Sequence, residues 1–124
     1  MSKLINLATP NENIYVSDIK KDYIENIIAS AKQCKFISKI ILFGSSLEER
    51  CTEYSDIDIA VFGDKTKSQI FRLASYDKFY ESIYSLGMQT YDILYFKEGD
   101  TKNEGTEIMN SILSGKVIYT RDNT

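Results

Sequence analysis

Histidine is absent from this 124-residue sequence, and cysteine occurs only twice. The absence of histidine excludes Ser-His-Asp and Cys-His catalysis, HExxH zinc sites and histidine general bases. Cys34 and Cys51 form no CxxC pair, so neither a disulfide framework nor a structural zinc site is expected. We interpret both as packed thiols. Any chemistry must therefore use carboxylates, hydroxyls, lysine or a bound metal ion.

Long apolar segments are also lacking. No run approaches the roughly 20 residues of a membrane helix, and the N-terminus has no continuous apolar stretch before a small-residue cleavage site. We therefore predict a cytoplasmic protein with no membrane contact. The net charge of −3 gives no general attraction to a phosphate backbone, so direct nucleic-acid binding is not expected. The length predicts one domain over residues 1–124.

The hydrophobic periodicity alternates between the helical and the extended type. Apolar residues recur at three- and four-residue steps in some segments, which predicts helices, and form short continuous runs in others, which predicts strands. The expected helices are 17–34, about 65–86 and 108–113, and the expected strands are 38–44, 56–62, 89–96 and 116–119. This order predicts a small layered α/β or α+β fold, with a small mixed β-sheet and flanking helices.

Tyrosine and lysine residues recur in the predicted helices. Tyr76, Tyr80 and Tyr84 recur at four-residue steps, which favours an aromatic face packed onto the sheet or a partner over a nucleobase-stacking surface. Lys20-Lys21 and Lys65-Lys67 lie where helices are expected to begin, and we interpret them as solvated helix ends.

Two aspartates one residue apart open the strand predicted over 56–62. Residues i and i+2 of a strand share a face, so Asp56 and Asp58 project together while Ile57 and Ile59 point to the core. Mg²⁺ prefers such oxygen ligands and fills its other positions with water and phosphate oxygens. Asp92, in the next strand, would supply a third carboxylate for a two-metal site. The alternative is a solvated start of a strand.

Gly44, Ser45 and Ser46 follow the strand predicted over 38–44. Glycine lets the backbone approach a ligand closely, and free N–H groups at a helix start attract phosphate. Ser45-x-x-Glu48 and the overlapping Ser46-x-x-Glu49 each match a capping box, which predicts a short helix here. A turn with a capped helix would explain these residues without any ligand. The segment lacks the Gly-Lys-Ser/Thr of a Walker A motif, so a P-loop NTPase is not supported.

Together these residues carry a family resemblance. Gly44-Ser45, ten intervening residues and then Asp56-Ile57-Asp58 resemble the GSx10DxD signature of the polymerase-beta-like nucleotidyltransferase superfamily. The chain is particularly similar to minimal nucleotidyltransferase (MNT) proteins over roughly residues 17–120.

That resemblance implies transfer of a nucleoside monophosphate, most often AMP from ATP, to a hydroxyl acceptor with release of pyrophosphate. It implies that Asp56, Asp58 and Asp92 hold Mg²⁺ or Mn²⁺, that Asp92 helps to activate the acceptor, and that Gly44, Ser45 and Ser46 contact the nucleotide. MNT proteins of this size are often antitoxins of HEPN ribonuclease toxins, and some adenylylate a tyrosine of the toxin. A homo- or hetero-oligomer is compatible with this. The alternative is a non-catalytic antitoxin or binding module that neutralises its partner by forming a complex.

The sequence departs from the family pattern at one place. Many members carry arginine directly after Gly-Ser and again two residues later, where this chain has Ser46 and Glu48. The nearest basic residue is Arg50. If Arg50 does not reach the phosphates, or if Glu48 and Glu49 face them, nucleotide affinity is expected to be low.

Overall fold

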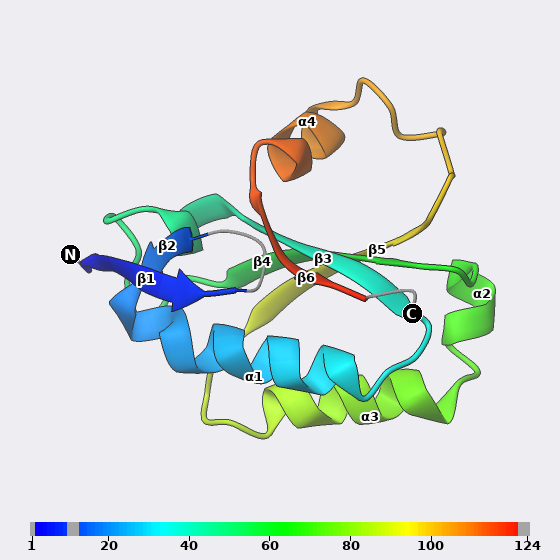
Figure 1. Cartoon of the computed structure of the whole chain (residues 1–124), viewed down its shortest axis with the longest axis horizontal. Helices are drawn as coiled ribbons and strands as arrows, with labels where there is room; N and C mark the ends of the chain where they lie inside the picture. The colour runs from blue at the N-terminus through cyan, green and yellow to red at the C-terminus, as the bar shows by residue number, and fades with distance from the viewer. Residues whose placement is uncertain (1, 10–12, 122–124) are drawn as a thin grey trace.

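The structure, a computed structural model, describes residues 2–9 and 13–121. Strands and helices are interspersed along the chain (Figure 1). The strands are β1 (Leu4–Ala8), β2 (Asn13–Ser17), β3 (Ile37–Phe43), β4 (Ile57–Gly63), β5 (Tyr91–Lys97) and β6 (Lys116–Thr120). The α-helices are α1 (Lys21–Lys32), α2 (Lys67–Ile70), α3 (Ala74–Tyr84) and α4 (Glu107–Leu113), and η1 (Asp18–Lys20) and η2 (Gly44–Leu47) are 3₁₀ turns.

A mixed four-stranded sheet in the order β5-β4-β3-β6 forms the centre of the molecule. β4 runs parallel to β5, whereas β3 is antiparallel to both β4 and β6. The parallel pair needs a long crossover connection, which α2 and α3 supply. Helices α1 and α3 lie side by side on one face of the sheet and α4 lies on the other (Figure 1). The predicted fold class, a mixed sheet with flanking helices, is confirmed.

The sheet buries side chains on both of its faces. Along β3, Ile40 and Leu42 belong to the larger core, which also contains Ile24 and Ile27 of α1, whereas Ile41 and Phe43 point to the smaller core under α4. Successive residues of a strand point to opposite faces, so a strand covered on both sides has a continuous apolar run. This explains why the IILF segment contains no polar residue.

The structure departs from the predicted elements in several places. The helix expected from residue 17 begins as the 3₁₀ turn η1 and becomes α-helical at Lys21. The helix expected over 65–86 is divided into α2 and α3, because Leu73 is extended, with φ −95° and ψ 128°. The first half, capped by Thr66, buries Ile70, whereas the second half turns to pack along α1. The hairpin of β1 and β2 was not among the predicted strands, although Ile14 and Val16 alternate with exposed residues and are fully buried.

Predictions about single side chains had mixed outcomes. Cys34 and Cys51 are buried free thiols, as expected. Tyr76 and Tyr84 pack against the larger core, as expected, while Tyr80 remains 44% exposed. The interpretation of Lys20 as a solvated helix end was wrong, because this residue is only 1% exposed.

No helix in the described part of the chain combines the length and the apolar character needed to cross a membrane.

Arg121 joins the end of β6 to the end of α1. Its guanidinium donates hydrogen bonds to the carbonyl oxygens of Ala31 at 3.1 Å, Cys34 at 2.7 Å and Ile37 at 3.0 Å. A cation at a helix C-terminus also interacts favourably with the helix dipole. Arg121→Met is therefore expected to lower the free energy of unfolding by about 2 kcal/mol. Urea unfolding measures this, with Lys116→Met, which removes an exposed charge from the same strand, as the control. Equal losses in the two variants would contradict the role given to Arg121.

Candidate active site

The parallel pairing of β4 and β5 brings two of the predicted carboxylates level with each other. Asp58 and Asp92 are direct Cα partners across the two strands. Both alternate with core residues, so they lie on the face of the sheet that carries α4. Asp58 is half-buried and Asp92 is exposed to solvent. A ligand at this edge can therefore reach both carboxylates.

Gly44 lies directly against Asp58. Phe43, the last residue of β3, is the cross-strand partner of Asp58, and Gly44 follows it with a φ of +78°. A Cβ atom at position 44 would lie 2.3 Å from Oδ2 of Asp58, closer than any side chain tolerates. Position 44 therefore requires glycine for two reasons, the positive φ and the space occupied by the carboxylate.

Asp56 lies at the same end of the sheet, just before β4, and is exposed. The hydroxyl of Thr90 donates a hydrogen bond to its Oδ1 atom. Thr90 also accepts, through its carbonyl oxygen, a 3.1 Å hydrogen bond from the backbone N–H of Ile57. The side chain of Asp56 is thus held by the residue that leads into β5.

The clustered charges perturb the middle carboxylate. Burial raises the pKa of Asp58 above its ordinary value, and the nearby negative charges of Asp92 and Asp56 raise it further. The positive charge of Arg50 acts in the opposite direction. The three predicted acids are therefore close enough to interact, and an added cation would relieve their repulsion.

The donor set fits a hard divalent cation, because carboxylate oxygens are the ligands that Mg²⁺ and Mn²⁺ prefer. Among residues 2–9 and 13–121, no three metal-ligating side chains are already drawn together into one group. Thr90 holds the Oδ1 atom of Asp56, so Oδ2 is the oxygen of this carboxylate that would bind a cation.

The Gly-Ser segment forms η2 rather than a capped α-helix. Phe43 precedes this 3₁₀ turn and provides no side-chain cap, so neither predicted capping box forms. Glu48 is extended, which places its side chain outside any helix. Ser45 is half-buried, while Ser46 is fully buried and its hydroxyl has no hydrogen-bond partner. Of these two residues, only Ser45 exposes part of its surface to a ligand.

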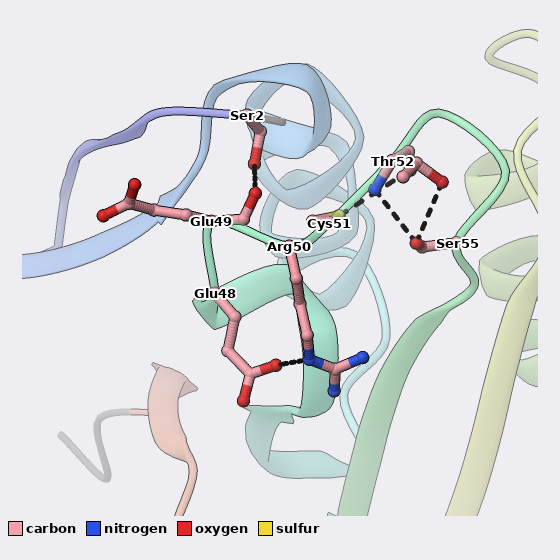
Figure 2. Close-up of polar contacts among 7 residues, drawn as sticks. All are labelled: Ser2, Glu48, Glu49, Arg50, Cys51, Thr52 and Ser55. Carbon is pink, nitrogen blue, oxygen red and sulfur yellow. Dashed lines mark hydrogen bonds and ion pairs between the residues drawn. The ribbon is translucent and has the colours of Figure 1, made fainter.

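Arg50 lies within electrostatic range of the acids, although it follows Gly-Ser at an unusual spacing. Its guanidinium forms an ion pair with Glu48, and both side chains are largely exposed. Figure 2 shows these two side chains turned toward each other, while the carboxylate of Glu49 points away from them. Because the charge of Arg50 lowers the pKa of Asp58, a basic group is present beside the carboxylates. Glu48 offsets this positive charge.

Three residues that lie behind Asp56 were not predicted to be part of the site. Lys20, Gln89 and Thr90 form a chain of hydrogen bonds that ends at the carboxylate of Asp56. One signal for Lys20 is present in the sequence, since it lies at helical spacing from the buried residues Ile24 and Ile27.

A comparison with protein families agrees with this geometry. The family described as "Polymerase beta, Nucleotidyltransferase" matches residues 25–124. The chain belongs to the polymerase beta nucleotidyltransferase family. No curated protein matches the sequence. Membership gives a general activity, the transfer of a nucleoside monophosphate from a nucleotide substrate.

The close approach of Gly44 to Asp58 predicts that a side chain at position 44 destabilises the fold. Gly99→Ala provides a matched control, because Gly99 also has a positive φ, of +82°, but nothing lies within 4 Å of its missing Cβ. Gly99→Ala should cost about 1 kcal/mol of unfolding free energy, which is the backbone penalty alone. Gly44→Ala should cost about 1–3 kcal/mol more, because the methyl group displaces Asp58. Urea unfolding measures both, and equal costs would show that the contact is unimportant.

The raised pKa of Asp58 predicts that its ionised carboxylate destabilises the folded, metal-free protein at neutral pH. A folded-state pKa above the unfolded value means that the folded state binds the proton more tightly. The free energy of unfolding should therefore fall as pH rises from the ordinary value of 3.8 through the folded pKa. Asp58→Asn should remove this fall and raise the melting temperature at neutral pH in the presence of a chelator.

Thermal unfolding from pH 4 to pH 8 tests this expectation. Asp64→Asn, which changes an exposed aspartate beyond the other end of β4, is the control. A lower melting temperature for Asp58→Asn than for the wild type at pH 7 would contradict the prediction.

Proposed function

We propose that this protein is a metal-dependent nucleotidyltransferase that transfers AMP from ATP to a hydroxyl group of a partner protein. The observation that carries the proposal is the level pairing of Asp58 with Asp92, with Asp56 beside them and Gly44 against the Asp58 carboxylate. Neighbouring acidic side chains repel one another without a cation, and the negatively charged phosphates of a nucleoside triphosphate need cations for the same reason.

In this proposal Asp56, Asp58 and Asp92 hold Mg²⁺ or Mn²⁺. The bound ions would neutralise the triphosphate and polarise the reacting phosphoryl group. Asp92, which is exposed on the edge strand β5, would accept the proton of the acceptor hydroxyl. Gly44 and Ser45, at the start of η2, would contact the phosphates through their backbone and the Ser45 hydroxyl, and Arg50 would add positive charge. The chemistry then requires mostly alignment and charge neutralisation, and no histidine.

We further propose that the acceptor is a tyrosine of a HEPN-type toxin, and that this protein acts as its cytoplasmic antitoxin. The support is the family membership together with the resemblance to minimal nucleotidyltransferases.

A second candidate is a binding module that neutralises its partner without catalysis. The ion pair between Glu48 and Arg50 favours it, because it offsets the basic group nearest to the acids.

Transfer of label from α-labelled ATP distinguishes the two candidates. The wild type with Mg²⁺ is expected to label a discrete protein band in a lysate of the source organism that contains the product of the neighbouring gene. Asp56→Asn should reduce labelling at least about 100-fold while partner binding is retained, because it removes a metal ligand. Asp64→Asn, a charge-matched exposed control, should label like the wild type. No label from any of the four NTPs would favour the binding module.

A further inference from the structure

Lys20 is a buried charge that the proposed reaction does not use. It is 1% exposed, and its ammonium donates hydrogen bonds to the carbonyl oxygens of Glu53 at 3.3 Å and Ser55 at 2.7 Å. The third hydrogen bond goes to Oε1 of Gln89. An ammonium has three N–H donors, so all of them have partners.

The acceptors of Lys20 lie in the two segments that hold Asp56. Glu53 and Ser55 belong to the loop that leads directly into Asp56. Gln89 lies on the other side, where its amide donates to the carbonyl oxygens of Ser55 at 2.9 Å and Thr90 at 2.6 Å. The hydroxyl of Thr90 then donates to Asp56. Lys20 therefore joins the two segments, and one of its acceptors, Ser55, directly precedes Asp56 in the chain.

Burying an ammonium is costly, so this arrangement needs a reason. Desolvation lowers the pKa of Lys20, while the negative charges of Asp56 and Glu53 act in the opposite direction. An apolar side chain would fill the same space without the desolvation cost. What an apolar side chain cannot do is bind two backbone carbonyl groups and an amide at once.

The rest of the N-terminal segment supports the same loop from its other end. The backbone N–H and the hydroxyl of Ser2 donate to the carbonyl oxygen of Glu49, at 3.0 and 3.2 Å (Figure 2). Ser2 and Lys20 thus contact the connection between η2 and β4 near both of its ends. This segment lies before the part of the chain, 25–124, that matches the polymerase beta family.

We infer that Lys20 is a positioning residue that holds the 53–55 loop and Gln89 together, and thereby places the Asp56 carboxylate for binding of a divalent cation. The inference rests on the proposed metal site at Asp56 and Asp58. It assigns to the N-terminal segment a part in the active site, acting through the backbone rather than through contact with substrate.

The sign of the effect on metal affinity separates positioning from simple electrostatics. By Coulomb's law alone, removal of a nearby positive charge should strengthen the binding of a cation. If Lys20 acts by positioning, its removal should weaken binding, because Asp56 then loses its fixed place. Side chains that orient metal ligands typically change affinity by about 10-fold or more.

The test is Mn²⁺ binding, measured with Mn²⁺ alone by electron paramagnetic resonance well below the melting temperature of each variant. Lys20→Met keeps the length of the side chain and removes the donors, and it should weaken Mn²⁺ binding about tenfold. Lys21→Met, which removes the same charge from the next residue, should change affinity less than about twofold. In an Asp56→Asn background, Lys20→Met should have almost no further effect, because the two residues act through one ligand.

Several results would overturn the inference. Unchanged or tighter Mn²⁺ binding by folded Lys20→Met would do so while leaving the proposed function intact, as would an equal loss in the Asp56→Asn background. No Mn²⁺ binding by the wild type would overturn both the inference and the proposed metal site.

A measurement on the wild type keeps the inference testable if Lys20→Met does not fold. The protons of a buried, hydrogen-bonded ammonium exchange slowly, so the ¹⁵Nζ signal of Lys20 can be observed by NMR. Addition of Mg²⁺ should shift this signal and leave in place the ¹³Cε signal of Lys32, an exposed lysine at the end of α1. An unshifted Lys20 signal at saturating Mg²⁺ would overturn the inference.

Discussion

The architecture depends on the hydrogen-bonded register between two parallel strands, β4 and β5, which holds Asp58 beside Asp92. Two carboxylates on adjacent strands repel each other, and the raised pKa of Asp58 records that repulsion together with burial. The repulsion is tolerated because buried apolar residues on the opposite face, such as Ile57 and Ile59, fix the strand. Parallel pairing in turn requires the crossover through α3, which packs against α1 and completes the larger core.

The two faces of the sheet have different tasks. One is covered by α1 and α3, whereas among the described residues the helix on the other is the short α4, which contacts β3 (Figure 1). Asp58 and Asp92 lie on this second face, where Phe62 of β4 and Leu94 of β5 remain partly exposed. The uneven cover leaves Asp92 exposed and Asp58 half-buried, whereas the larger core lies on the opposite face.

Local patterns explain which parts of this arrangement were predictable. The position of Asp58 on the face opposite Ile57 and Ile59 follows from alternation within one strand, and the mixed sheet follows from the order of apolar runs. Asp56 was expected in the same strand but lies just before β4, where Thr90 holds its carboxylate. The alignment of Asp58 with Asp92 depends on pairing between strands 34 residues apart in the chain, which no local pattern determines. The capping boxes near Ser45 matched in residue type but not in backbone, because the chain leaves η2 in an extended conformation at Glu48. The burial of Lys20 was not predicted, because its charge indicated an exposed side chain. Its helical spacing from the buried residues Ile24 and Ile27 indicated the opposite.

The contacts of Ser2 and Lys20, on either side of the N-terminal hairpin, bear on where the folded domain begins. A boundary drawn at the family match would begin at residue 25, within α1, and would separate the sheet from Ser2 and Lys20. The part of the chain that matches the family contains the three aspartates, but Ser2 and Lys20, which lie outside that part, bind the loop that leads to Asp56. A protein shortened to residues 25–124 would therefore keep the family signature and lose the hydrogen bonds that hold this loop.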